Sequence, residues 1–115
     1  MNETTCPFCR IAAGTLPADL VATEASWIAF RDLHPQAPVH VLIVPRRHLV
    51  SAVELEGDPA LAGTLLAAVA RVARREGLAE RGYRIVSNVG HEGGQTVPHL
   101  HFHLLGGRPL HWPPG

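Results

Sequence analysis

Three histidines lie at alternate positions near the C-terminal end of the chain, at His99, His101 and His103. In a β-strand, side chains two residues apart leave the same face, so this spacing predicts one surface lined by three imidazoles. The apolar residues between them, Leu100 and Phe102, would pack behind that surface. Histidine titrates near neutral pH and serves as nucleophile, acid, base or metal ligand. The segment therefore predicts a chemical site.

A glycine-rich segment comes shortly before the histidines, with Gly93, Gly94, Gln95 and Thr96 in succession. Glycine permits tight turns whose backbone N–H groups face an anion. The hydroxyl of Thr96 and the amide of Asn88 add further donors, so we expect a phosphate above the histidines. One neutral imidazole there could attack phosphorus and form a phosphohistidine-type intermediate, which water then resolves. Neighbouring histidines favour this neutral form, because a nearby positive charge disfavours protonation.

Two alternatives to a phosphate site remain open for the three histidines. Alternating histidines can decorate a half-buried strand without any chemical role. Three histidines can also hold a metal by themselves, as in open zinc sites.

The composition excludes several classes of function. All ten basic residues are arginines, which rules out a Schiff-base lysine and the lysine of a phosphate-binding P-loop. Ten acidic residues balance them, so the chain has no global field for nucleic acid or an anionic membrane. No apolar run approaches the roughly 20 residues of a membrane helix, and the N-terminus lacks a secretory pattern. We therefore expect a soluble cytoplasmic protein with one domain, residues 1–115.

The elements expected around these motifs form an α+β fold. Residues 58–77 give the clearest helix, since Asp58 suits the cap, Pro59 the first helical position and Gly77 the position past the end. The other expected elements are a short helix over residues 8–13 and strands over residues 20–23, 27–31, 39–44, 83–88 and 98–105. The hairpin-like succession of strands predicts an antiparallel sheet of about five strands with the long helix on one face.

Both cysteines of the chain belong to one motif, Cys6-Pro-Phe-Cys9. A structural disulfide is not expected in the cytoplasm, which leaves metal binding or redox chemistry. The motif resembles that of glutaredoxins, in which the first thiol lies at a helix N-terminus after a β-strand. Only five residues precede Cys6, too few for such a strand, so metal binding is the favoured interpretation. A tetrahedral zinc site would need two further ligands, and histidines can supply them.

The histidine segment resembles the His-φ-His-φ-His-φ-φ signature of the histidine triad (HIT) superfamily of nucleotide hydrolases and transferases, where φ is apolar. Further segments resemble the nucleotide-binding Hint branch, at residues 30–40, 44–48, 83–88 and 106–115. The resemblance covers essentially the whole chain and implies the HIT-like fold. It also implies an enzyme that cleaves purine nucleoside monophosphate conjugates through a covalent nucleotidyl-histidine, with phosphoramidates as the expected substrates.

The resemblance assigns roles to individual residues. His101 would be the nucleophile, and His103 would stand beside the α-phosphate and the leaving group. His99 would orient the nucleophile, and His40 would be a fourth histidine behind the triad. The residues implied to bind a purine nucleotide, with Asp32 at the ribose hydroxyls, are Pro7, Phe8, Ile11, Phe30, Asp32, Leu33, Asn88, Gly94, Gln95, Thr96, Val97, His101, His103 and Trp112.

Bacterial members of the superfamily also suggest a metal and an assembly. The resemblance implies a structural zinc held by Cys6, Cys9, His48 and His99, and no catalytic metal. It further implies a homodimer in which the tail, residues 111–115, reaches the active site of the partner subunit.

Some positions depart from the Hint pattern. Thr96 stands where that branch usually has serine, and threonine is more typical of the dinucleoside-polyphosphate branch of the superfamily. Arg31 and His34, next to the expected ribose site, also differ from the commonest residues. Two alternatives to a phosphoramidase therefore stand: a dinucleoside polyphosphate hydrolase, and a purine nucleotide-binding module without catalysis.

Overall fold

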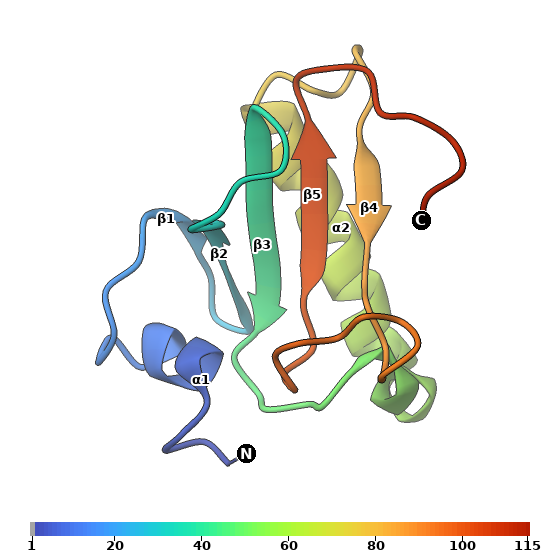
Figure 1. Cartoon of the computed structure of the whole chain (residues 1–115). Coiled ribbons are helices and arrows are strands. Elements are labelled where there is room, and N and C mark those ends of the chain that lie inside the picture. The colour runs from blue at the N-terminus through green and yellow to red at the C-terminus, as the bar shows by residue number, and fades with distance from the viewer. Residues whose placement is uncertain (1) are drawn as a thin grey trace.

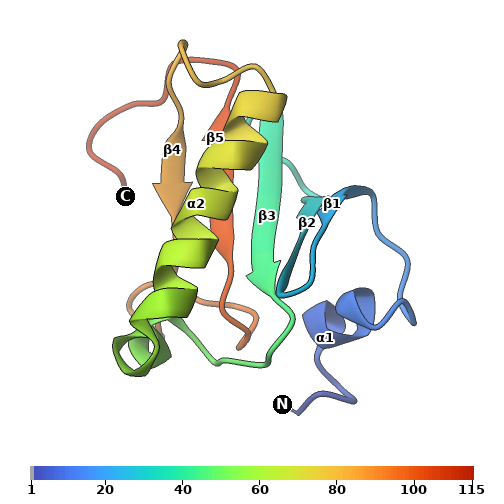
Figure 2. The ribbon, with the colours of Figure 1, turned by 180° about the vertical axis from the view of Figure 1, so that it is seen from behind.

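A five-stranded antiparallel sheet forms the centre of the molecule, with the strands in the order β1-β2-β3-β5-β4. The computed structural model describes residues 2–115. Its elements are α1 (Pro7–Ala12), β1 (Leu20–Thr23), β2 (Trp27–Arg31), β3 (Val39–Pro45), the 3₁₀ helix η1 (Ala52–Gly57), α2 (Pro59–Arg75), β4 (Arg84–Val86) and β5 (Phe102–Gly106). Helix α2 crosses one face of the sheet, and α1 lies by the β1–β2 hairpin (Figures 1 and 2). The expected α+β architecture is confirmed.

The central strand β3 is buried on both faces. Val41 and Ile43 belong to the apolar cluster that α2 forms with the sheet. The alternate residues Leu42 and Val44 belong to a second cluster, which includes Phe8 of α1. A strand covered on both sides has no solvent face, which explains the nearly uninterrupted apolar run of its sequence.

Helix α2 begins and ends where its sequence signals indicate. The side chain of Asp58 accepts a 3.1 Å hydrogen bond from the backbone N–H of Leu61, which satisfies one free donor of the first turn. Gly77 follows the helix with φ +77°, a conformation that favours glycine. At the same end, a 2.7 Å ion pair between Glu76 and Arg31 joins the helix to β2. No helix among residues 2–115 combines the length and apolar character needed to cross a membrane.

The strand expected to carry all three histidines is shorter than the alternation indicated. Strand β5 begins at Phe102, so of the triad only His103 lies within it. The preceding segment starts with Pro98, which has no N–H for a sheet. The backbone N–H of Leu100 then donates to the carbonyl of Leu49, over 2.7 Å, instead of to β3. Strand β4 is also shorter than expected, at Arg84–Val86.

The register between β3 and β5 defines the face that carries the site. His103 lies opposite Leu42, and His40 lies opposite Leu105. Because residues two apart on a strand share a face, His40, Leu42 and His103 point to the same side. Leu42 belongs to the cluster around α1, so this side is the one opposite α2.

Candidate active site and metal cluster

The imidazoles of His101 and His103 lie side by side, with ring centroids 5.0 Å apart. His101 is 6% exposed. The ring of Phe8 packs edge-on against His101 at 5.0 Å and against His99 at 5.7 Å. Helix α1 therefore covers the segment before β5 and limits the access of water to it.

The backbone sets the tautomer of His101. Its Nδ1 lies 2.7 Å from the carbonyl oxygen of His99. A carbonyl oxygen only accepts, so Nδ1 carries the proton and Nε2 keeps its lone pair. Burial lowers the pKa of His101, which favours this neutral form. His101 is thus a neutral imidazole with a free Nε2, as a nucleophile requires.

His103 has the opposite tautomer, set by a chain of two hydrogen bonds. The backbone N–H of Gln36 donates to Nδ1 of His40 over 3.0 Å, so His40 carries its proton on Nε2. That Nε2 lies 2.8 Å from Nδ1 of His103 and donates to it. Nε2 of His103 therefore carries the proton of its neutral ring. Burial, and then the neighbouring His101 and His40, lower the pKa of His103 to about 4.

Asp32 lies at the end of this chain. Its Oδ2 is 3.5 Å from Nε2 of His40, and its Oδ1 accepts a 2.8 Å hydrogen bond from the backbone N–H of His34. Ligand atoms of Asp32, His40 and His103 lie within 4.8 Å of one another. Nε2 of His40 is protonated, however, and so has no lone pair for a metal. The hydrogen bond between His40 and His103, with Asp32 beside it, therefore accounts for this group without a metal.

An apolar cavity of about 420 Å³ opens beside these groups. Of the residues expected to bind nucleotide, it is lined by Pro7, Phe8, Ile11, Phe30, Asp32, Leu33, Thr96 and Val97. Leu16, Pro17 and Ala18 also line it, and we did not expect them. Their signal was weak, an apolar stretch in the loop between α1 and β1. Apolar walls with one carboxylate suit a flat ring attached to a hydroxylated sugar.

In the loop before the triad, the polar side chains form hydrogen bonds with backbone carbonyls of the loop and its surroundings. Nδ2 of Asn88 donates to the carbonyl of Gly93 over 2.7 Å. Nε2 of Gln95 donates to the carbonyls of Val50 and Val97, at 2.7 and 3.0 Å. These amides therefore shape the loop in this structure, and phosphate binding by Asn88, Gly94 and Gln95 stays a prediction.

The two cysteines converge with two histidines, one of which is the first histidine of the triad. Sγ of Cys6 lies 3.2 Å from Nδ1 of His99, and Sγ of Cys9 lies 3.2 Å from Nδ1 of His48. The four donor atoms are all within 4.8 Å of one another. Zn–S and Zn–N bonds of about 2.3 and 2.0 Å separate tetrahedral ligands by roughly 3.3 to 3.8 Å. The cluster therefore has the donor set and the size that zinc requires.

The protonation of His99 also suits a ligand. Its Nε2 lies 2.9 Å from the carbonyl oxygen of Pro45, so Nε2 carries the proton and Nδ1 presents a lone pair to the sulfurs. Burial, and then Cys6, raise the pKa of the Cys9 thiol to about 12. A bound cation would offset this by favouring the thiolate.

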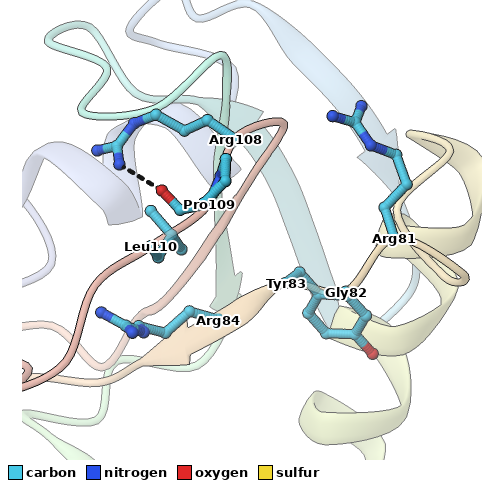
Figure 3. A pocket seen from close by; sticks show the side chains of 7 residues that line it. All are labelled: Arg81, Gly82, Tyr83, Arg84, Arg108, Pro109 and Leu110. Carbon is cyan, nitrogen blue, oxygen red and sulfur yellow. Dashed lines mark hydrogen bonds between the residues drawn. The ribbon is translucent and has the colours of Figure 1, made fainter.

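A second concavity, of about 250 Å³, lies between β4 and the C-terminal segment (Figure 3). Three arginines at it or beside it donate to backbone carbonyls: Arg81 to Gly107 at 3.2 Å, Arg84 to His111 at 2.7 Å, and Arg108 to Pro109 at 2.9 Å. The bonds of Arg81 and Arg84 hold the C-terminal segment beside β4, and that of Arg108 lies within the segment. The ring of Trp112 is 80% exposed and does not line the apolar cavity of its own chain.

A family model described as the HIT domain matches residues 13–110. The chain therefore belongs to the HIT domain family. The match agrees with the signature formed by His99, His101 and His103, and with the five-stranded sheet.

Relatives and solved structures agree with this assignment. An uncharacterised HIT-like protein of Synechococcus elongatus is 50% identical over the full length of both chains. The purine nucleoside phosphoramidase of Escherichia coli is 45% identical over 90% of this chain and 87% of its own. A HIT family hydrolase from Legionella pneumophila superposes with a TM-score of 0.93 at 46% identity, covering 96% of this chain and all of that structure.

Proposed function

We propose that the protein hydrolyses purine nucleoside 5′-phosphoramidates through a nucleotide bound covalently to His101. The observation that carries the proposal is the pair of opposite tautomers in neighbouring rings. His101 has a free lone pair on Nε2, and His103 has its proton on Nε2. A nucleophile beside a hydrogen-bond donor is the arrangement that group transfer at phosphorus requires. The 45% identical relative is named a purine nucleoside phosphoramidase.

The reaction would take place in two displacements. Nε2 of His101 attacks the α-phosphorus, the P–N bond to the leaving amine breaks, and the nucleotide is held on His101. The N–H on Nε2 of His103 donates to the departing nitrogen and passes its proton to it, so that the group leaves as a neutral amine. Water then attacks phosphorus and returns a proton to Nε2 of His103, the P–N bond to His101 breaks, and the nucleoside monophosphate leaves.

The cavity supports a purine nucleotide as the group transferred. The base would lie between Phe8, Ile11 and Phe30, where apolar walls make few base-specific contacts. The carboxylate of Asp32 would accept the ribose hydroxyls. The phosphate would lie against residues 94–97, next to the histidines.

The cysteine–histidine cluster would hold a structural zinc through Cys6, Cys9, His48 and His99. The metal would take no part in the displacements. It would fasten the N-terminal segment, which carries Phe8, to the segment that carries His101. The fit of the donor atoms described above supports this assignment.

We also propose that the protein works as a homodimer. The exposed ring of Trp112 and the fastening of its tail at the β4 edge support the idea that the tail serves a second subunit. A cytoplasmic location stays a prediction.

A direct assay separates this function from its alternatives. The purified protein is incubated in turn with adenosine 5′-phosphoramidate and with diadenosine polyphosphates, and the release of AMP is measured. We expect kcat/KM for the phosphoramidate to be higher by at least about tenfold, or 1.4 kcal/mol. The reverse order would favour the dinucleoside polyphosphate hydrolase suggested by Thr96, which lines the cavity. Binding of AMP without turnover of either substrate would indicate a binding module.

A further inference from the structure

Asp32 contacts two parts of the site that have different tasks. Its carboxylate lines the apolar cavity, where the proposed function places the ribose. The same carboxylate also reaches the histidine chain, with Oδ2 at 3.5 Å from Nε2 of His40. Among residues 2–115, this is the only close contact between a side-chain carboxylate and an imidazole nitrogen, and burial lowers the pKa of His40, which favours its neutral form.

The backbone fixes which carboxylate oxygen faces His40. Oδ1 is occupied by the backbone N–H of His34, at 2.8 Å. Oδ2 is thereby directed to His40, whose side chain is only 4% exposed. A charge beside a buried imidazole is weakly screened by solvent, so the contact acts on His40 more strongly than its length suggests.

We propose that Asp32 is a positioning residue for catalysis as well as a ribose ligand. The negative charge on its Oδ2 favours the proton of His40 on Nε2, the tautomer that the backbone N–H of Gln36 also favours, and so keeps the proton of His103 on the nitrogen that faces the phosphate. Binding of the ribose and orientation of His103 would then depend on one carboxylate. This inference rests on the proposed function for its ribose part and on the geometry alone for its histidine part.

The substitution Asp32→Asn isolates the contact with His40. Asparagine has the same shape, and its Oδ1 can still accept from the backbone N–H of His34. Its amide nitrogen then takes the place of Oδ2, so that a donor faces the N–H of His40. The matched control is Asp19→Asn, the same chemical change at a side chain that is 75% exposed and lies 3.7 Å from Arg31.

The kinetic test uses two substrates, adenosine 5′-phosphoramidate and its 2′,3′-dideoxy analogue, which has no hydroxyl for Asp32 to bind. With the dideoxy analogue we expect Asp32→Asn to lower kcat by roughly 10- to 100-fold, because misplaced catalytic groups cost that much. Asp19→Asn should leave kcat unchanged. If Asp32 only binds ribose, Asp32→Asn will not alter kcat for the dideoxy analogue, and the positioning role is overturned.

A spectroscopic test does not depend on turnover. Nitrogen-15 NMR of the imidazoles distinguishes Nδ1–H from Nε2–H. We expect His40 and His103 to be Nε2–H tautomers in the wild type and in Asp19→Asn. In Asp32→Asn we expect both residues to be mixtures of the Nε2–H and Nδ1–H tautomers. Unchanged tautomers in Asp32→Asn would overturn the inference. A wild type that cleaves neither phosphoramidate would overturn the proposed function, while the NMR comparison would still decide the role of Asp32.

Discussion

His99 and His101 are joined by a 2.7 Å hydrogen bond from the Nδ1–H of His101 to the carbonyl oxygen of His99. The ring of His99 points the other way, with its own Nδ1 at 3.2 Å from Sγ of Cys6. His99 therefore belongs to the cysteine–histidine cluster through its side chain and sets the tautomer of His101 through its backbone. The cysteine motif and the histidine triad, far apart in sequence, form one structure.

Loss of a metal ligand should reduce stability and metal content together. We expect His48→Ala to abolish the binding of one zinc per chain and to lower the melting temperature by about 10 °C, because a structural zinc contributes folding free energy. Elemental analysis and calorimetry measure the two effects. The control His91→Ala removes an exposed histidine outside the cluster and should change neither. A wild type that contains no zinc and has the same melting temperature as His48→Ala would contradict the zinc assignment.

Glycine is required at position 93 because the backbone of Val89 lies close to its Cα. A Cβ at this position would collide with the carbonyl oxygen and the amide nitrogen of Val89. We expect Gly93→Ala to lower the free energy of unfolding by about 1–3 kcal/mol and to raise KM, because the loop where the proposed function places the phosphate must shift. Gly57→Ala, at a position with no atom within 4 Å of the added carbon, should be nearly neutral. Equal stability of the two variants, measured by urea unfolding, would disprove the loop geometry.

His103 should make stability depend on pH in the acidic range. Its folded pKa of about 4 lies below the ordinary 6.5, mainly because of burial. The facing groups are His101 and His40, which lower the pKa, and Asp32, which raises it. The unfolded chain thus binds the proton more readily, so the stability supplied by neutral His103 is complete above pH 6.5 and is lost as pH falls toward 4.

The corresponding measurement compares the wild type with His103→Gln. From pH 7 to pH 5, the free energy of unfolding of the wild type should fall by more than that of the variant, because the variant has lost the contribution of His103 while the other buried histidines are common to both. The metal cluster is common to both proteins and cancels in the difference. If the wild type and His103→Gln differ in free energy of unfolding by the same amount at pH 7 and at pH 5, His103 has an ordinary pKa.

The C-terminal tail should affect catalysis and not the fold. Truncation after Leu110 removes Trp112, whose ring is 80% exposed and contributes little to the core of its own chain. If the tail serves a partner subunit, KM should rise roughly fivefold, equivalent to about 1 kcal/mol, while the melting temperature changes little. Truncation after Pro113 keeps the tryptophan and is the control. Unchanged kinetics, or a monomer by sedimentation, would argue against the role.

Much of the fold could be predicted because its signals are local. Asp58, Pro59 and Gly77 mark the bounds of α2 through capping and backbone conformation, and the structure follows them. The run within β3 is apolar because both of its faces are covered. The predicted length of β5 was wrong, since the backbone N–H of Leu100 donates to Leu49 in the loop after β3, and alternation does not reveal such a partner.

The site could be predicted as a set of residue types but not as a set of protonation states. The tautomers of His101 and His103 depend on the carbonyl of His99 and on the backbone N–H of Gln36. Neither group has a sequence signature, because every residue except proline has both a carbonyl and an N–H. The hydrogen bond from the side chain of Asn88 to the carbonyl of Gly93 likewise depends on how the loop folds in three dimensions.

The central claim is that Nε2 of His101 is the nucleophile. The most direct test mixes the enzyme with an adenosine phosphoramidate that has a fast leaving group, quenches the reaction in alkaline denaturant, and measures the mass of the intact protein. We predict one adenylyl group per chain, mapped by peptide sequencing to His101, and no adduct in His101→Asn, whose kcat should fall at least about 10⁴-fold. An adduct on another residue, or undiminished turnover by His101→Asn, would contradict the account.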